Sequence, residues 1–206
     1  MARYNPRKEK SFKRTGRTRE VKQSFLIVCE GVNTEPEYFK AFRLTSANVK
    51  AIGKGLSTIR LVEEAIIIKN VEERKQHVFD QYWVVFDKDQ SSDENFDKAI
   101  KLAEKNGFKV AYSNQAFEFW FLLHFNLYQG KIHRDRYEEM LSKVSGVAYN
   151  KKEGFVTKFF QLLEPLQPAA IERAIKILAD FNGMTPSKAE SSTTVHELVI
   201  ELNKFR

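Results

Sequence analysis

The sequence predicts an α/β protein in which a parallel sheet of about four strands is flanked by helices and followed by a helical C-terminal lobe. Three observations indicate this class. Apolar runs of strand length alternate with amphipathic helical patterns as far as residue 125, an order typical of parallel sheets with right-handed crossovers. Two of these runs are apolar throughout, as in strands buried on both faces. Beyond residue 134 the sequence shows helical patterns only.

The first half of the expected core contains two strands and two helices. The strands are expected at residues 24–29 and, from a weaker pattern, 49–52. A helix is expected over residues 34–44, and Thr34 with Glu37 predicts a capping box at its start. Ser57 is expected to cap a longer helix that ends near residue 76. The inner face of that helix should carry Ile59, Val62, Ile66 and Val71.

The second half of the core is expected to contain strands at residues 82–86 and 108–112. The helix between them should begin within residues 91–95 and end at Gly107, because glycine favours the left-handed conformation that follows many helices. An aromatic-rich helix is expected at 114–125. The later helices are expected at 134–144, 152–163, 168–181 and 193–204. These elements predict a basic disordered arm at 1–22, an α/β core at 23–130 and a helical lobe at 131–206.

The composition indicates a soluble globular protein. The chain has 206 residues, of which 42% are hydrophobic and 30% charged. No apolar run approaches the roughly 18 residues of a membrane span, and the charged N-terminus does not resemble a secretory signal. The single cysteine, Cys29, excludes an intramolecular disulfide and a Cys-rich zinc site. We therefore expect a cytoplasmic protein without a membrane partner.

The net charge of +7 is concentrated at the N-terminus. Residues 1–22 hold nine bases and two acids, which accounts for the whole excess, and the remaining residues hold 25 of each. A basic arm beside a neutral body is typical of contact with nucleic-acid phosphates. A solubility tail, or an arm that folds onto an acidic face, is the alternative. The expected nucleic-acid-binding residues of the arm are Arg3, Arg7, Lys8, Lys10, Lys13, Arg14, Arg17, Arg19 and Lys22.

Carboxylates follow two of the predicted strands at the point where each strand ends. Glu30 follows the first apolar run and precedes Gly31, while Asp87 and Asp89 follow the run that begins at residue 82. The ligand site of an open α/β sheet lies just outside the carboxyl ends of its strands. Carboxylate oxygens are the ligands that Mg²⁺ prefers, and a divalent cation relieves the repulsion between them. The three acids therefore predict a magnesium site.

A fourth acid lies in the aromatic-rich helix. Glu118 stands among aromatic residues, where a buried carboxylate is costly unless it is paired or functional. It could be a further ligand or a general base, or it could form a salt bridge with a core Arg or Lys. His124, six residues later, is a possible catalytic residue, although a hydrogen-bonded structural histidine is the more common case.

The quoted motifs resemble the Toprim domain of primases, topoisomerases and related nucleases. In that family a Glu after the first strand and an Asp-x-Asp after a later strand bind Mg²⁺. Over nearly its whole length the chain resembles more closely the RloB-like family, which is found with restriction-modification and phage-defence loci. The matching segments are the basic start and residues 27–31, 34–39, 85–89, 113–125 and 191–199.

The resemblance implies a Mg²⁺- or Mn²⁺-dependent nuclease that cleaves RNA such as tRNA, or DNA, in an anti-phage system. Glu30, Asp87 and Asp89 take the roles of metal ligands and catalytic acids, Glu118 completes the catalytic set, and Lys88 is expected to contact phosphate. Nucleic acid is the expected partner, and a defence-system ATPase or a restriction-modification protein could be a second. The chain has no visible insertion for strand passage and no further domain with a nucleophilic tyrosine, which disfavours topoisomerase activity.

Other functions use the same residues. The protein could be a non-catalytic adaptor that binds nucleic acid or a nucleotide, or a transferase that acts on a nucleotide. The hydroxyl-rich segment at 191–194 could bind phosphate, but Ser192 or Thr193 as a cap of the last helix is favoured. His196 could still face the site if that helix packs back on the sheet.

Overall fold

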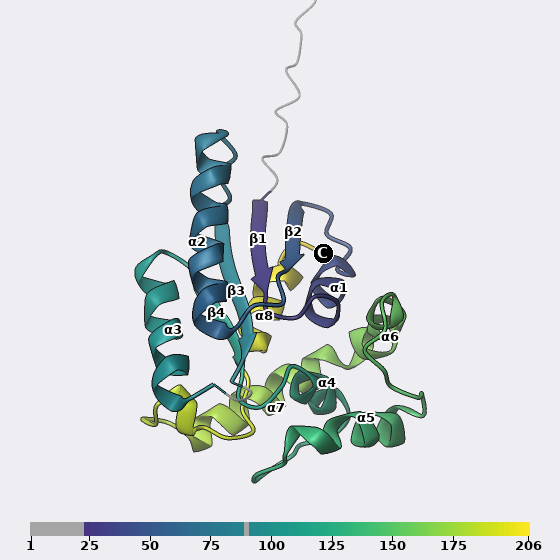
Figure 1. Ribbon diagram of the computed structural model, residues 1–206. Helices are drawn as coiled ribbons and strands as arrows, with labels where there is room; N and C mark the ends of the chain where they lie inside the picture. The colour runs from purple at the N-terminus through teal and green to yellow at the C-terminus, as the bar shows by residue number, and fades with distance from the viewer. Residues whose placement is uncertain (1–22, 89–90) are drawn as a thin grey trace, which may run out of the picture.

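The computed structural model describes residues 23–88 and 91–206, so the basic arm and Asp89 lie outside the described residues. Its centre is a sheet of four parallel strands in the order β2-β1-β3-β4 (Figure 1). This confirms the predicted fold class and the alternation of strands and helices. The strands are β1 (Gln23–Cys29), β2 (Ala47–Gly53), β3 (Gln81–Asp87) and β4 (Lys109–Ser113).

The strand order puts β1 and β3 side by side at the centre of the sheet. Cys29 pairs with Val85 on β3 and with Gly53 on β2, so the three strands end at nearly the same level. The chain leaves β1 toward one edge of the sheet and β3 toward the other, which makes the β1/β3 boundary the point where the strand order reverses. Open α/β sheets bind their ligands at such a point.

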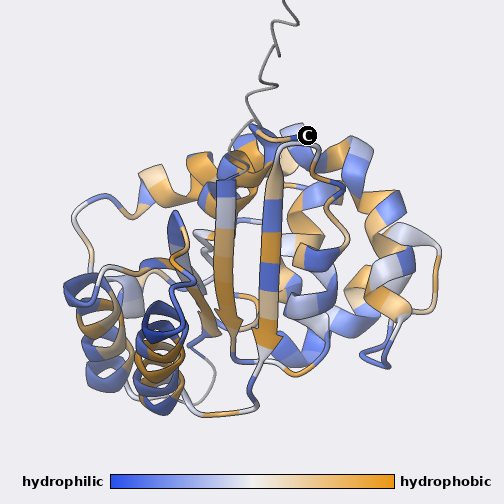
Figure 2. Ribbon diagram, turned by 90° about the horizontal axis from the view of Figure 1, so that it is seen from above, coloured by the Kyte–Doolittle hydropathy of each residue, from blue (hydrophilic) through white to orange (hydrophobic). Residues whose placement is uncertain are grey.

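Helices cover both faces of the sheet, as Figure 1 and Figure 2 show. Alternate side chains of β1 enter two separate hydrophobic clusters, with Phe25 and Ile27 in one and Leu26 and Val28 in the other. The cluster around Leu26 is closed by α2 (Thr58–Arg74) and α3 (Asp93–Lys105). The larger cluster includes residues of α1 (Thr34–Lys40), α4 (Glu118–Phe125) and α8 (Val195–Asn203).

The later helices join the larger cluster around Phe25. They are α5 (Tyr137–Ser145), α6 (Phe155–Leu163) and α7 (Gln167–Asp180), and short 3-10 turns precede α5, α7 and α8 at 134–136, 164–166 and 186–188. The aromatic helix α4 lies between α5 and α7 and contacts both. In the described part of the chain, no helix combines the length and the apolar character that a membrane span requires.

The start of α1 differs from the expected capping box. Asn33, not Thr34, occupies the N-cap position, and α1 ends at Lys40 rather than near residue 44. The Glu37 carboxylate does not fold back on its own helix. It accepts hydrogen bonds from the main-chain N–H groups of Gly154 (2.6 Å) and Val156 (3.1 Å) at the start of α6. The first turn of α6 contains no acidic residue, so Glu37 supplies its cap from another element.

One further local expectation was wrong. Val71, expected on the inner face of α2, is exposed, whereas Val62 is buried as expected, together with Leu61 and Ala65.

The segment 191–194 lies at the start of α8. Thr194 occupies the N-cap position, but the Thr193 hydroxyl accepts a hydrogen bond from the Val195 N–H at 3.2 Å, so Thr193 does satisfy a donor of the first turn. The Thr194 hydroxyl accepts a hydrogen bond from the Tyr112 N–H at 2.9 Å. The four hydroxyls are buried, and the segment covers the open edge of β4.

Candidate functional site

A cavity of about 310 Å³ opens at the carboxyl ends of β1 and β3. The loop that follows β1, the end of β3 and the start of α4 form its walls, together with side chains from the segments before α5 and α6. Its lining contains both signs of charge. The charged residues are Glu30, Glu35, Asp87, Glu118, Arg134 and Lys151.

Glu30 and Asp87 meet across the two central strands, as the sequence predicted. The Glu30 N–H donates to the Val85 carbonyl at 2.9 Å, which extends the pairing of β1 with β3 by one residue. The Glu30 Oε2 then accepts from the Asp87 N–H at 3.1 Å. Burial is the main cause that raises the pKa of Glu30 to about 7, and the nearby Glu35 carboxylate adds to it. The hydrogen bond from the Asp87 N–H acts in the opposite direction.

Asp87 joins the end of β3 to α4 and lies among the other acids of the site. Its Oδ2 accepts from the Phe117 N–H at 3.1 Å, which ties the end of β3 to the start of α4. Its Oδ1 is buried and has no hydrogen-bond partner among the described residues. Burial first, then the charges of Glu35, Glu118 and Glu30, raise the pKa of Asp87 well above its usual value. An oxygen of this kind is suited to accept a cation or a proton.

Glu35 was missed by the sequence reasoning, which read its surroundings as a helix start. Its side chain is buried at 4% exposure, and Oε1 accepts from the Gly31 N–H at 3.1 Å. Burial, with the Glu118 charge adding to it, raises the pKa of Glu35 to about 7. A Cβ at Gly31 would overlap the Glu35 carboxylate, so any larger residue at this position requires that carboxylate to move. The signal in the sequence was an acid four residues after Gly31, in the first turn of the next helix.

Glu118 lines the cavity and is also ion-paired. Its Oε1 accepts from the Tyr149 hydroxyl at 3.0 Å and lies 2.9 Å from the Lys151 Nζ. The salt bridge that the sequence left open is therefore present, with a lysine from the segment between α5 and α6 and not from the core. Neither Tyr149 nor Lys151 was singled out in the sequence, because each stands more than 30 residues from Glu118.

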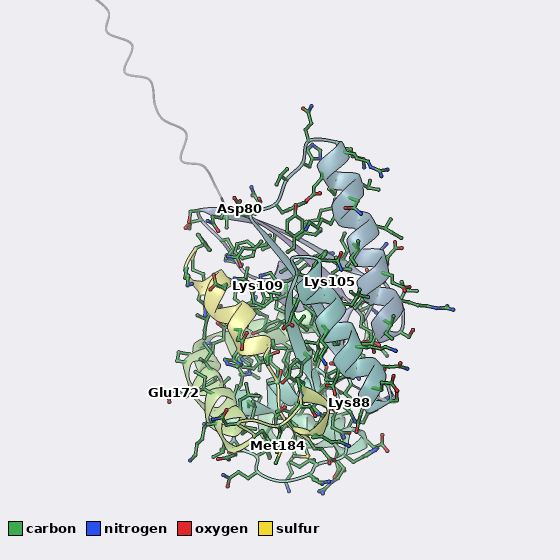
Figure 3. All side chains as sticks on the ribbon, turned by 90° about the vertical axis from the view of Figure 1, so that its left-hand side faces the viewer. Asp80, Lys88, Lys105, Lys109, Glu172 and Met184 are labelled. Carbon is green, nitrogen blue, oxygen red and sulfur yellow. The ribbon has the colours of Figure 1, made fainter. Side chains whose placement is uncertain are left out.

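Three expected site residues do not line the cavity. Lys88 follows β3 at the carboxyl end of the strand, and Asp80 lies at the other end (Figure 3). The Lys88 Nζ pairs with Asp93 at 2.9 Å. Asp93 also pairs with Lys188, so Lys88 is held toward α3. His124 is a structural histidine: its Nδ1 donates to the Trp120 carbonyl at 2.9 Å, and burial lowers its pKa to about 3. His196 is buried at the start of α8, where burial lowers its pKa.

The donors of the site fit a hard divalent cation in their chemistry. Glu30 and Asp87 supply carboxylate oxygens, one of them buried without a partner, and both have raised pKa values that a cation would lower. Within residues 23–88 and 91–206, no three His, Cys, Asp or Glu side chains gather closely enough to hold a metal ion. Asp89, the third ligand expected from the sequence, lies outside these residues.

Comparisons with known proteins agree with the family resemblance. The model of the family described as RloB-like protein matches residues 25–202, which include Glu30, Asp87 and Glu118 and cover most of the chain. No curated protein and no solved structure matches the sequence. Since the match runs from the first strand of the sheet to the last helix, the chain belongs to the RloB-like protein family.

Proposed function

We propose that this protein is a metal-dependent phosphodiesterase that cleaves nucleic acid, either RNA such as tRNA or DNA, in a bacterial anti-phage defence system. The observation that carries the proposal is the meeting of Glu30 and Asp87 in one cavity at the point where the strand order reverses. The arrangement of these two acids agrees with the Toprim-type motif that predicted them.

Magnesium or manganese is the proposed cofactor. Glu30 and Asp87 would hold it, with Asp89 as the third expected ligand. When bound, such a cation neutralises charge on a phosphate and makes water more acidic. It also relieves the repulsion among the buried carboxylates, which adds to burial in raising their pKa values.

The proposed reaction is hydrolysis of a phosphodiester. A bond forms between a water oxygen and phosphorus, the P–O bond to the leaving ester oxygen breaks, and the proton lost by the water is balanced by the proton gained at that oxygen. Glu35, whose pKa is raised to about 7 and which is not one of the proposed ligands, can take up and release protons near neutral pH. Arg134 and Lys151 supply positive charge on the wall of the same cavity.

A cleavage assay tests the proposal. Purified protein is incubated with labelled tRNA, single-stranded RNA and duplex DNA in Mg²⁺, Mn²⁺ or EDTA, beside an Asp87→Asn/Asp89→Asn variant. We expect metal-dependent products from the wild type and none from the variant. Glu94→Gln is the matched control, because Glu94 is an exposed acid of α3 outside the cavity. Full activity in the Asp87→Asn/Asp89→Asn variant would disprove the assignment.

A non-catalytic adaptor that binds nucleic acid or a nucleotide, in a complex with a defence-system ATPase or a restriction-modification protein, is the second candidate. The neutral charge of residues 23–206 and the aromatic-rich helix α4 are compatible with such a role. Metal-dependent binding without any product after long incubation would support it. Release of pyrophosphate from a nucleoside triphosphate would instead indicate a transferase.

A further inference from the structure

Lys151 reaches the cavity from the segment between α5 and α6. Its Nζ lies 2.9 Å from Glu118 Oε1, and the Tyr149 hydroxyl donates to the same oxygen at 3.0 Å. The side chain of Glu118 is 4% exposed, whereas that of Lys151 is 51% exposed. The ion pair therefore has a buried anionic end and an open cationic end, and the open end lines the cavity that contains Asp87.

The net charge of the cavity lining equals that of one divalent cation, with the opposite sign. Its described lining has four carboxylates and two cationic groups, a net charge of −2 when all are ionised. One Mg²⁺ neutralises that charge, but a phosphodiester brings a further negative charge into the site. A phosphate in such a place needs a donor that carries positive charge and faces the open cavity.

Lys151 meets this need. An ammonium group has three N–H donors, and Glu118 takes one of them at hydrogen-bond distance. The next carboxylate on Lys151 is Glu138, whose Oε1 is 3.8 Å from Nζ and so beyond a normal hydrogen bond. Donors therefore remain for the non-bridging oxygens of a phosphate.

Glu118, in contrast, is already committed to protein partners. Its Oε1 accepts a charge-assisted bond from Lys151 and a hydroxyl bond from Tyr149. These two bonds fix the position of the Glu118 carboxylate, which in turn orients the Lys151 side chain. Its burial and pairing account for the presence of an acid in an aromatic helix without any bond to a metal.

We propose that Lys151 binds the phosphate of the substrate in this cavity and that Glu118 is its positioning residue rather than a metal ligand. The inference rests on the proposed function, because it assigns two residues of the same site. It distinguishes Glu118 from Glu30 and Asp87, which would hold the cation. It also assigns a role to a residue that neither the sequence motifs nor the strand ends point to.

The experiment compares Lys151→Gln, Lys151→Arg and Glu118→Gln with the wild type. Lys152→Gln is the matched control, because Lys152 is the exposed neighbour and does not line the cavity. Three quantities are measured: Mn²⁺ affinity by calorimetry, affinity for a labelled single-stranded RNA in Ca²⁺ by fluorescence anisotropy, and kcat and KM of cleavage. Circular dichroism establishes that each variant is folded.

We expect Lys151→Gln to weaken RNA binding about tenfold or more and to lower kcat about 100-fold, as for loss of one charge-stabilising donor. Lys151→Arg should restore part of both, and Lys152→Gln should resemble the wild type. Glu118→Gln should lower kcat while Mn²⁺ affinity stays within about twofold of the wild type.

Two results would overturn the inference alone: wild-type RNA affinity in Lys151→Gln, or loss of Mn²⁺ binding in Glu118→Gln. If the wild type binds RNA but cuts nothing, the RNA affinity of Lys151→Gln still decides the role of the lysine. A wild type that binds neither Mn²⁺ nor RNA would overturn the proposed function, and the inference with it.

Discussion

At the scale of single residues, the site depends on a close contact between Gly31 and Glu35. The Gly31 N–H donates to the Glu35 carboxylate, and a side chain at position 31 would occupy the place of that carboxylate. Any larger residue here therefore displaces the Glu35 carboxylate. This contact lets a buried acid approach the end of β1, where the sequence alone indicated only Glu30.

We expect Gly31→Ala to lower the free energy of unfolding by about 1–3 kcal/mol, because the added methyl displaces the Glu35 carboxylate. Urea denaturation measures the change. A double-mutant cycle with Glu35→Ala provides the control, since the alanine at 31 has no carboxylate to displace once Glu35 is removed. Equal costs of Gly31→Ala in the presence and absence of Glu35 would show that the contact is not the cause.

Glu35 also makes stability depend on pH. Its folded-state pKa is raised to about 7 from an ordinary value near 4.5, so its favourable contribution is present below about 4.5 and is lost as pH rises through 7. We expect the melting temperature of the wild type to fall further below that of Glu35→Gln at pH 8 than at pH 5.5, without metal. The buried His124 destabilises both proteins equally at low pH, so it cancels in the difference.

Magnesium or manganese should remove this difference at pH 8, because a cation stabilises the ionised carboxylates, and should have little effect at pH 5.5. Thermal denaturation at the two pH values, with and without metal, measures all four conditions. A wild type that is as stable as Glu35→Gln at pH 8 without metal would contradict the raised pKa.

At the scale of elements, α1 links the sheet to the later helices. Its Tyr38 packs against Phe117, Phe121 and Phe160, and its hydroxyl accepts from the Trp120 indole at 2.9 Å. On the same helix, Glu37 caps the start of α6. The segment that leads into α6 contains Lys151. The cap therefore contributes to the position of this wall of the cavity.

We expect Glu37→Ala to destabilise the protein by about 1–2 kcal/mol, the usual cost of losing a helix N-cap. Glu153→Ala is the control, because it removes an exposed acid just before α6 without removing the cap. Chemical denaturation of the two variants gives the comparison. If both variants lose the same stability, loss of negative charge and not loss of the cap would be the explanation.

How far each element could be predicted follows from where its stabilising contacts lie. β1 and β3 are continuous apolar runs buried on both faces, so their ends, and with them Glu30 and Asp87, could be located from the sequence. β2 is an edge strand with exposed residues among buried ones, which explains its weaker pattern. Glu37 was expected to serve its own helix, but its partner Val156 lies 119 residues away. Lys151 enters the site only through such long-range packing. Glu35 is only four residues from its partner Gly31, and it was missed because it also fits the start of a helix.

At the scale of the whole molecule, the excess positive charge and the residues of the candidate site lie in different parts of the sequence. The excess of +7 lies in residues 1–22, while the remainder has equal numbers of acids and bases. The described lining of the cavity is net negative without a cation. A neutral body with an acidic cavity does not attract a polyanion over long distances. Under the proposed function, attraction of nucleic acid is therefore expected to come from the arm and cleavage from the cavity.

We expect removal of residues 1–22 to weaken RNA binding and to remove most of its salt dependence. Each phosphate that the arm neutralises contributes about −0.7 to the slope of log affinity against log salt for a single strand, so nine bases set a limit of about −6. Fluorescence anisotropy between 50 and 300 mM salt, roughly the range in which such slopes are measured, gives the slope for both proteins. A full-length variant with the nine bases replaced by glutamine is the matched control and should behave like the truncated protein. Mn²⁺ affinity should stay unchanged in both, since the proposed ligands lie outside the arm. An unaltered salt slope in either variant would place the phosphate contacts on the body of the protein and would contradict the division of roles between arm and cavity.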